Sequence, residues 1–529
     1  MKIPVISDAV KYSRLAWDLR SFLHNNITLE QSKQVISTRL QNRDKNFLSL
    51  MRKGIYGNPK SPYLKLLKLA GCEIGDIESM VSKDGIEATL QKLLAEGVYL
   101  NWEEFKGKRE TTRGGSHLRF DESDFDNPFL SSYYYSRSSG TRSAGTRTQF
   151  DLRHILETTY YRMIMHAVND TLDVPVGVWH AALPSQAGTS NLLKYSIMGK
   201  PVVRWFSPVT EGQTRASLRD RLATRYIIYA GRLWGARLVK PEYVSLADAV
   251  KVARWMADAK KEFGGCCLSS FVSPAVKVCQ AAMENGLDIQ GTHFLVGGEP
   301  LTEAKRQQIE NAGASVTPGY FMNEIGTVGF GCPGFTADDV HLFHDSVALI
   351  QHQRKVENTD IYVDAFLFTC ILSTARKILI NVESDDYGVL EARSCGCLFE
   401  QLGFNKHIHS IRSFAKLTGS GMTIVGSDFV RILEEVLPRE YGGAATDYQL
   451  LEEEDGQGQT HLSLIISPAV GAVNESDVIN TVFQELRRSA YCGKLAAGFW
   501  SQVGALQVKR VYPLSSVGKI TTLHLVRKN

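Results

Sequence analysis

Apolar residues in the first quarter of the chain recur every three or four positions among charged ones. Tyr63–Leu69 and Ile86–Leu94 show this spacing, which predicts amphipathic helices. Ser61 followed by Pro62 has the form of a helix N-cap with a proline in the first turn. We therefore expect residues 1–127 to be a mostly helical part of a larger domain that shapes one wall of a pocket.

The pattern then changes to short β-rich runs that alternate with amphipathic helices. Residues 174–179, 267–272 and 292–296 have the length and composition of buried strands, and helical spacing follows the last two. Strands that alternate with helices favour an α/β domain with a mainly parallel sheet, which binds ligands at the carboxyl ends of its strands. The turn Gly297–Gly298 falls at such an end.

Farther along, strands come with fewer helices, which predicts an antiparallel β subdomain and then a small α+β domain. Tyr448–Leu451 and Leu462–Ile466 flank the turn-forming residues Asp455–Gly458, as expected for a hairpin. The predicted fold class is α/β, with mixed or parallel sheets in a large N-terminal domain and a small, mobile C-terminal domain. We assign residues 128–410 to the core of the large domain and residues 411–529 to the C-terminal domain.

The composition is that of a soluble globular chain with at least two domains. Of 529 residues, 43% are hydrophobic and 22% charged. The formal net charge of +4 is small at this length, so it gives no reason to expect nucleic-acid or anionic-membrane binding. No apolar run is long enough to cross a bilayer, and the nine scattered cysteines suit reduced thiols. We expect a cytoplasmic protein without membrane insertion.

A loop of hydroxyls, glycines and arginines lies just before a predicted helix that opens at Asp151. Glycine lets the backbone approach a bulky anion, hydroxyls and free amides donate to phosphate oxygens, and arginine has a geometry suited to phosphate. The alternative is a flexible, solvated linker. The candidate phosphate-binding residues are Ser138, Ser139, Gly140, Thr141 and Arg142.

Three later segments also carry residues suited to chemistry. They are Gly297–Leu301, Gly319–Gly326 and Pro513–Ile520. Taken singly, the first is a turn that leaves a strand, the second has an acid in a loop, and the third has a lysine beside a glycine. Only their order and combination favour a common site.

Together the four segments resemble the motifs of the adenylate-forming superfamily of acyl-CoA synthetases, firefly-type luciferases and peptide-synthetase adenylation domains. The likeness is closest to phenylacetate-CoA ligases and acyl-protein synthetases, and it extends from Ser138 to the end of the chain. It implies that the loop ahead of Asp151 holds phosphate. It also implies that the segment with Gly298, Glu299 and Pro300 contacts adenine.

The resemblance implies roles for five further residues. Tyr320 would stack on adenine, with Asn323 in the same nucleotide-binding element. Glu324 would reach Mg²⁺, for which a carboxylate is a suitable hard-oxygen ligand. Lys519 would be the catalytic lysine. Arg412 keeps the spacing of the arginine in the hinge segment and is expected, with Lys519 and Glu324, among the catalytic residues.

The sequence departs from the family pattern at the nucleotide. Arg142-Ser143 stands where Thr-Gly is usual in the phosphate loop. The ribose-binding Thr-Gly-Asp element is expected at Cys395–Cys397, where no acid stands. Glu391 and Glu400 are the two alternatives for the ribose contact.

The resemblance implies an enzyme that activates a small carboxylic acid as acyl-AMP with release of pyrophosphate, using ATP and Mg²⁺. Such a reaction gathers negative charge, and the site must supply donors, cations and a metal where it develops. The acyl group would then pass to a thiol on CoA, a carrier protein or a protein cysteine. The rival hypothesis is a non-catalytic protein with this fold that binds an acyl or nucleotide ligand, or a partner protein.

The pocket for the acid is expected among residues that flank the nucleotide motifs. They are Trp179, His180, Phe271, Phe294 and Met322.

Two weaker signals leave their alternatives open. Three short pairs have residue types found in zinc sites, but no two CxxC motifs accompany them. They are His341-x-x-His344, His407-x-His409 and Cys395-x-Cys397. They are favoured as core or surface residues. Cys492 is either an acyl acceptor or, as favoured, a small buried thiol.

Overall fold

The computed structural model gives the fold of most of the chain. The described residues are 14–15, 17–131, 134–137, 147–183, 185–210, 218–335, 337–355, 362–413, 418–419, 422–423, 427–454, 460–488, 506–515 and 518–526. Among these residues, no helix combines the length and apolar character that a bilayer-spanning segment needs.

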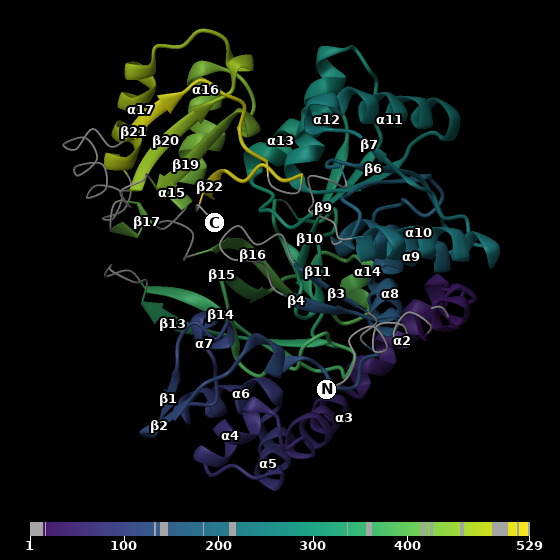
Figure 1. Cartoon of the computed structure of the whole chain (residues 1–529), viewed down its shortest axis with the longest axis vertical. Helices are drawn as coiled ribbons and strands as arrows, with labels where there is room; N and C mark the ends of the chain where they lie inside the picture. The colour runs from purple at the N-terminus through teal and green to yellow at the C-terminus, as the bar shows by residue number, and fades with distance from the viewer. Residues whose placement is uncertain are drawn as a thin grey trace.

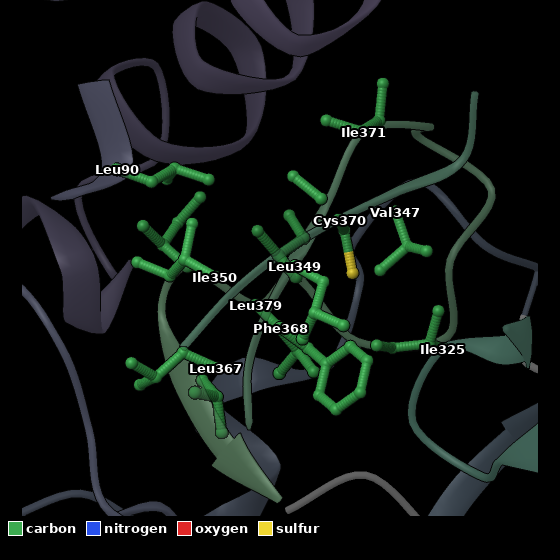
Figure 2. Packing of buried hydrophobic residues seen from close by; sticks show 14 of the residues in the cluster. Leu90, Ile325, Val347, Leu349, Ile350, Leu367, Phe368, Cys370, Ile371 and Leu379 are labelled. Carbon is green, nitrogen blue, oxygen red and sulfur yellow. The ribbon is translucent and has the colours of Figure 1, made fainter. Parts of the chain in front are cut away.

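The N-terminal part is a group of helices, most of which lie at one end of the large sheet, whereas the first packs against the helix that opens at Asp151 (Figure 1). They are α2 (Leu29–Gln41), α3 (Arg43–Leu50), the π-type η1 (Met51–Tyr56), α4 (Pro62–Leu69), α5 (Ile74–Asp84), α6 (Ile86–Ala95) and α7 (Trp102–Phe105). Figure 2 shows how Leu90 of α6 meets Leu349 and Ile350 of strand β13 and Leu367 and Phe368 of β14 in one hydrophobic cluster. The helices thereby cover an apolar sheet face.

One mixed sheet of twelve strands forms the centre of the molecule, in the order β13-β14-β15-β16-β12-β11-β10-β9-β8-β5-β6-β7. The strands are β5 (Val176–Trp179), β6 (Val202–Ser207), β7 (Pro241–Tyr243), β8 (Cys267–Ser270), β9 (His293–Gly297), β10 (Ser315–Met322), β11 (Gly326–Phe330), β12 (Val340–Leu342), β13 (Val347–Lys355), β14 (Tyr362–Cys370), β15 (Val382–Ala392) and β16 (Lys406–Ser413). Pairs from β7 through β10 are parallel, and those from β10 through β13 are antiparallel. The predicted α/β class is confirmed, and the antiparallel strands continue the same sheet because β12 pairs with both β11 and β16.

Helices flank the parallel half of this sheet (Figure 1). They are α8 (Leu152–Val168), α9 (Gln186–Ile197), α10 (Leu218–Leu233), α11 (Ala249–Phe263), α12 (Val272–Glu284) and α13 (Glu303–Asn311), with short α14 (Leu398–Gln401) near the antiparallel half. Asp151 caps α8 by accepting from the backbone N–H groups of Arg153 and His154. Two short hairpins, β1–β2 (Thr111–Arg113 and Ser116–Leu118) and β3–β4 (Tyr134–Arg137 and Arg147–Phe150), precede α8.

The last part of the chain forms a separate sheet with its own hydrophobic cluster. Its strands are β19 (Tyr448–Glu454), β20 (Thr460–Ile466), β21 (Leu506–Lys509) and β22 (Leu523–Val526), in the order β21-β20-β19-β22. Its helices are α15 (Ser427–Arg431), the π-type η4 (Ile432–Val436), α16 (Leu437–Tyr441) and α17 (Glu475–Arg488). The antiparallel pairing of β19 with β20 confirms the predicted hairpin.

Buried ion pairs dock this C-terminal domain onto the large domain. Lys305 Nζ of α13 lies 2.8 Å from Glu434 Oε1 of η4, and both side chains are nearly inaccessible to solvent. Thr302 and Thr522 also donate to the Glu434 carboxylate. A second pair joins Lys277 of α12 to Asp447 at 2.8 Å. These contacts fix one relative position of the two domains.

Candidate active site

A cavity of about 230 Å³ opens where the parallel strands end. His180 follows β5, Ser269 and Ser270 end β8, and Gly297–Gly298 end β9, and all of them line the cavity. Helices α8 and α9 form its floor. The cavity therefore lies at the sheet edge where α/β folds bind ligands.

Lys519 reaches this cavity from the C-terminal domain. Its Nζ donates to the carbonyl oxygen of Gly298 at 3.0 Å and lies 4.4 Å from the centre of the Phe271 ring. A Cβ on Gly298 would lie 3.1 Å from Lys519 Nζ, and the backbone there has a φ of +75°. Glycine at this turn therefore permits both the chain direction and the approach of the lysine.

A hydrogen-bonded chain holds the Lys519 segment against the large domain. The backbone N–H of Ile520 donates to Ser273 Oγ, and Ser273 Oγ donates to Glu299, each at 2.9 Å. Burial raises the pKa of Glu299, whose carboxylate also accepts from the Ser273 backbone N–H. The Gly-Gly-Glu-Pro turn thus anchors the lysine segment as well as lining a cavity.

A second cavity, of about 170 Å³, lies on the other side of Gly297–Gly298. Its lining includes Glu299, Pro300 and Tyr320, which the sequence assigned to nucleotide binding, and Arg412, which it assigned to catalysis. The Tyr320 hydroxyl donates to Asp386 Oδ2 at 2.7 Å, and Arg412 Nη1 lies 2.9 Å from Asp338 Oδ2.

Asp386 is an acid beside Tyr320 that the sequence-based search for a ribose acid did not consider. Asp386 lies on β15 and lines the second cavity, whereas Cys395–Cys397 do not. Neither alternative acid lines it: Glu391 pairs with Arg393, and Glu400 accepts from the backbone N–H groups of its own turn. The order of the motifs directed the search to Cys395–Cys397, so it passed over Asp386, which lies earlier in the chain on β15.

Glu324 lies in the turn between β10 and β11, next to two cavity-lining residues, Asn323 and Gly326. Its Oε1 is 3.4 Å from Lys106 Nζ, which is equally far from Glu122. The remaining carboxylate oxygen is a hard donor of the kind Mg²⁺ accepts, and Mg²⁺ needs only one or two carboxylates when phosphates supply other ligands. Glu324 therefore fits a magnesium ligand.

The structure separates the five predicted acid-pocket residues. His180, Phe271 and Met322 line the first cavity. Trp179 and Phe294 are fully buried in the hydrophobic cluster between the sheet and helices α11 and α12, and neither lines the cavity. The predicted phosphate-binding residues Ser138–Arg142, and also Cys492, lie outside the described residues.

Two helices contribute a polar face that the sequence-based analysis did not identify. His154, Thr158 and Arg162 follow one another at four-residue spacing on α8, and Gln186, Ser190 and Lys194 do so on α9. Residues four apart lie on one helix face. The sequence signal that could have identified this face is the spacing of polar side chains, four residues apart, within helices that are otherwise buried.

This face carries positive charge and unused hydrogen-bonding capacity. Arg162 is 4% exposed, and its closest described polar partner is the Tyr195 hydroxyl at 3.4 Å. Buried atoms without a hydrogen bond in the described part of the chain include Arg162 Nε, His180 Nδ1, Ser190 Oγ and both side-chain ends of Gln186. Buried polar atoms usually have partners, so these atoms point to a polar ligand.

Neighbouring charges in the cavity are all of one sign. Four cationic side chains line it, and no described lining residue is an acid: the cations are Arg162, Lys194, Arg376 and Lys519. Burial, together with Arg162 and Arg376, lowers the pKa of Lys194 well below its usual value. Burial, with Arg162 and Lys519, lowers the pKa of His180 to about 3, so this imidazole is neutral.

Comparison with known proteins identifies the fold. No family model and no curated protein matches the chain. Among solved structures, 2-hydroxyisobutyryl-CoA ligase in the postadenylation state, in complex with R3-HIB-AMP, matches with a TM-score of 0.53 and 12% identity, over 95% of this chain and 91% of the ligase.

Two further matches have lower TM-scores. The same ligase with 2-HIB-AMP and CoA gives a TM-score of 0.44 at 12% identity, over 95% of this chain and 91% of that one. McyG A-PCP with phenylalanyl-adenylate gives 0.41 at 10% identity, over 94% and 82%. From the first match, the chain has the fold of 2-hydroxyisobutyryl-CoA ligase.

Proposed function

We propose that this protein activates a carboxylic acid as acyl-AMP at the expense of ATP. The observation that carries the proposal is the position of Lys519, which lines the first cavity, here called the acid cavity. Its ammonium group donates to the carbonyl oxygen of Gly298, a residue that lines both cavities. A compact cation there would stabilise the charge that develops when a carboxylate attacks the α-phosphate.

The second cavity supplies groups suited to adenosine. The Tyr320 ring would face adenine, and Asp386 and Arg412 would accept from and donate to the ribose hydroxyls. Glu324 would hold Mg²⁺, which would neutralise phosphate charge when bound. The acyl group would then pass to a thiol, on CoA or on a carrier protein.

The acid itself carries a second negative group. A carboxylate that meets Lys519 uses one cation, which leaves Arg162 on α8 and Lys194 on α9 as further cations in the cavity lining. Desolvated charges require partners, and among the described residues no ion pair joins an acid to Arg162, which is buried, or to Lys194, which is half-buried. We propose a small dicarboxylic acid, or an acid with a comparable distal anion, because the cavity is small.

Pyrophosphate exchange with a panel of acids tests both the adenylation reaction and the proposed class of acid. We expect Mg²⁺-dependent exchange with compact dicarboxylic acids and at least tenfold slower exchange with monocarboxylic acids of equal length. Exchange with the monocarboxylic acids alone would contradict the substrate class but keep adenylation. Binding of Mg-ATP without exchange for any acid would favour the non-catalytic protein.

Glu324→Gln should reduce acyl-AMP formation by roughly two to three orders of magnitude, the usual scale for one lost charge stabiliser. The fold should survive because glutamine keeps the size of the side chain. The measurement is exchange rate against Mg²⁺ concentration. Glu122→Gln is the matched control, since Glu122 shares Lys106 at 3.4 Å, and its effect should be far smaller. Wild-type rates for Glu324→Gln at low Mg²⁺ would remove Glu324 from the site.

A further inference from the structure

Four potential metal ligands meet in a cluster on the antiparallel side of the sheet, outside both cavities. Cys332 follows β11, His341 lies on β12, and Cys395 and Cys397 stand in the turn between β15 and α14. The ligand atoms all lie within 4.8 Å of one another. Residues 65 positions apart in sequence therefore converge because β11, β12 and β16 are neighbours in the sheet and β15 pairs with β16.

The distances fit a tetrahedral zinc centre. His341 Nε2 lies 3.3 Å from Cys332 Sγ, 3.6 Å from Cys395 Sγ and 3.3 Å from Cys397 Sγ. Zinc bonds of about 2.3 Å to sulfur and about 2.0 Å to nitrogen, at tetrahedral angles, would separate nitrogen and sulfur by about 3.5 Å. A single ion fits between these four atoms.

The imidazole of His341 is held in the form that binds a metal. Its Nδ1 lies 2.6 Å from the carbonyl oxygen of Phe404, and a carbonyl only accepts, so Nδ1 carries the proton. The lone pair of Nε2 therefore points at the three sulfurs. A backbone carbonyl that orients the ring in this way is the usual support of a metal-binding histidine.

The turn that carries Cys395 and Cys397 is folded so that both residues lie close to the other two ligands. The Glu400 carboxylate accepts from the backbone N–H groups of Cys395 and Gly396 and so folds the turn around itself. The backbone N–H of Cys397 lies 3.5 Å from Cys395 Sγ. A Cβ on Gly334 would lie 2.8 Å from Cys395 Cβ, so glycine leaves the space that the cluster needs.

We propose that Cys332, His341, Cys395 and Cys397 bind one structural zinc ion. All three cysteines are free thiols in the structure, and they would bind as thiolates and release their protons to solvent. Four protein ligands leave no open position, which is the arrangement of structural zinc sites and not catalytic ones. Of the histidines in the His-x-x-His and His-x-His pairs, only His341 belongs to the proposed site. His344, His407 and His409 lie outside the cluster.

Zinc would also stiffen one wall of the second cavity. Asp338 and Val340, which line it, lie next to His341, and Asp338 pairs with Arg412. Fixing His341 and Cys332 to the β15–α14 turn would hold this part of the chain in place. The zinc site would thus support the second cavity without lining it.

Metal content of the purified full-length chain tests the proposal. We expect one zinc per chain by elemental analysis after dialysis against a mild chelator. Cobalt replacement should give the thiolate-to-metal absorption of a tetrahedral sulfur-rich site. The double variant Cys395→Ser/Cys397→Ser should lose both signals, whereas Cys72→Ser, at a half-buried thiol outside the cluster, should keep them.

Two readouts do not depend on the double variant folding. Stripping zinc from the wild type should lower its melting temperature, and zinc should restore it. Wild-type protein that is folded, reduced and takes up neither zinc nor cobalt would overturn the proposal. A disulfide among these cysteines in freshly purified protein would overturn it too, as would zinc content in the double variant equal to that of Cys72→Ser.

Discussion

Lys519→Ala is expected to slow adenylation by at least three orders of magnitude while leaving nucleotide binding nearly unchanged. The ammonium group is the only part of the C-terminal domain that enters the acid cavity among the described residues, and it approaches by way of Gly298. Removing it takes away a cation that is placed where charge develops, and little that holds the ground-state nucleotide. Single-turnover formation of acyl-AMP and a nucleotide-binding titration measure the two effects.

The same variant also tests whether the C-terminal domain works in two positions. If the domain rotates between half-reactions, transfer of the acyl group from chemically prepared acyl-AMP to a thiol should survive in Lys519→Ala. Lys509→Ala, the same substitution on β21 of this domain, is the control and should leave both steps intact. Equal loss in both half-reactions, or in neither, would contradict the two-position mechanism.

Lys194→Met should have opposite effects on activity and stability. We expect kcat/KM for the dicarboxylic acid to fall by roughly 10²- to 10³-fold, since a substrate anion would lose its buried partner. The ligand-free protein should become more stable, because burial penalises the charged form of Lys194 and no ion pair with its ammonium group is found within the described structure. Steady-state kinetics and thermal unfolding measure the two effects.

The gain in stability should also depend on pH in a defined direction. Burial lowers the pKa of Lys194 in the folded protein, so the unfolded chain binds more protons between the folded value and about 10.4. Folding of the wild type is therefore disfavoured progressively as pH falls through this window. The stabilising effect of Lys194→Met should be full at low pH and vanish as pH rises toward 10.4.

Lys200→Met provides the matched control for Lys194. Lys200 follows α9 and donates to the carbonyl oxygens of Leu172 and Val174. Its replacement should destabilise the fold by leaving these carbonyls without a donor, and it should not change preference among acids. Destabilisation by both variants, with unchanged acid preference for Lys194→Met, would contradict a distal anion site.

The sequence predicted those features that depend on local pattern. Alternation of strands and helices placed Gly297–Gly298 at a strand end, and turn residues predicted the β19–β20 hairpin, because both follow from neighbours in the chain. Lys519 and Glu324 were identified by motif, and the structure places both at or beside the acid cavity. Their catalytic roles stay predictions.

Features that depend on convergence of distant segments could not be read from the sequence. Trp179 and Phe294 were assigned to the acid pocket from their position beside motifs, although both point into the core of the domain. Asp386 and Cys332 were missed because their partners, Tyr320 and His341, come from other strands. Strand order in a mixed sheet decides such meetings, and a motif carries no information about it.

The buried pair of Lys305 with Glu434 bears on how easily the two domains change position. Both charges are desolvated where the domains dock, and rotation would return both to water. The attraction lost and the hydration regained are of similar size. Such a pair therefore determines the relative orientation of the domains more than the free energy of their docking. A docked state held in this way would be close in free energy to its alternative. Substrate and product, which differ in charge, could then shift the population of the two states by their own differential affinity.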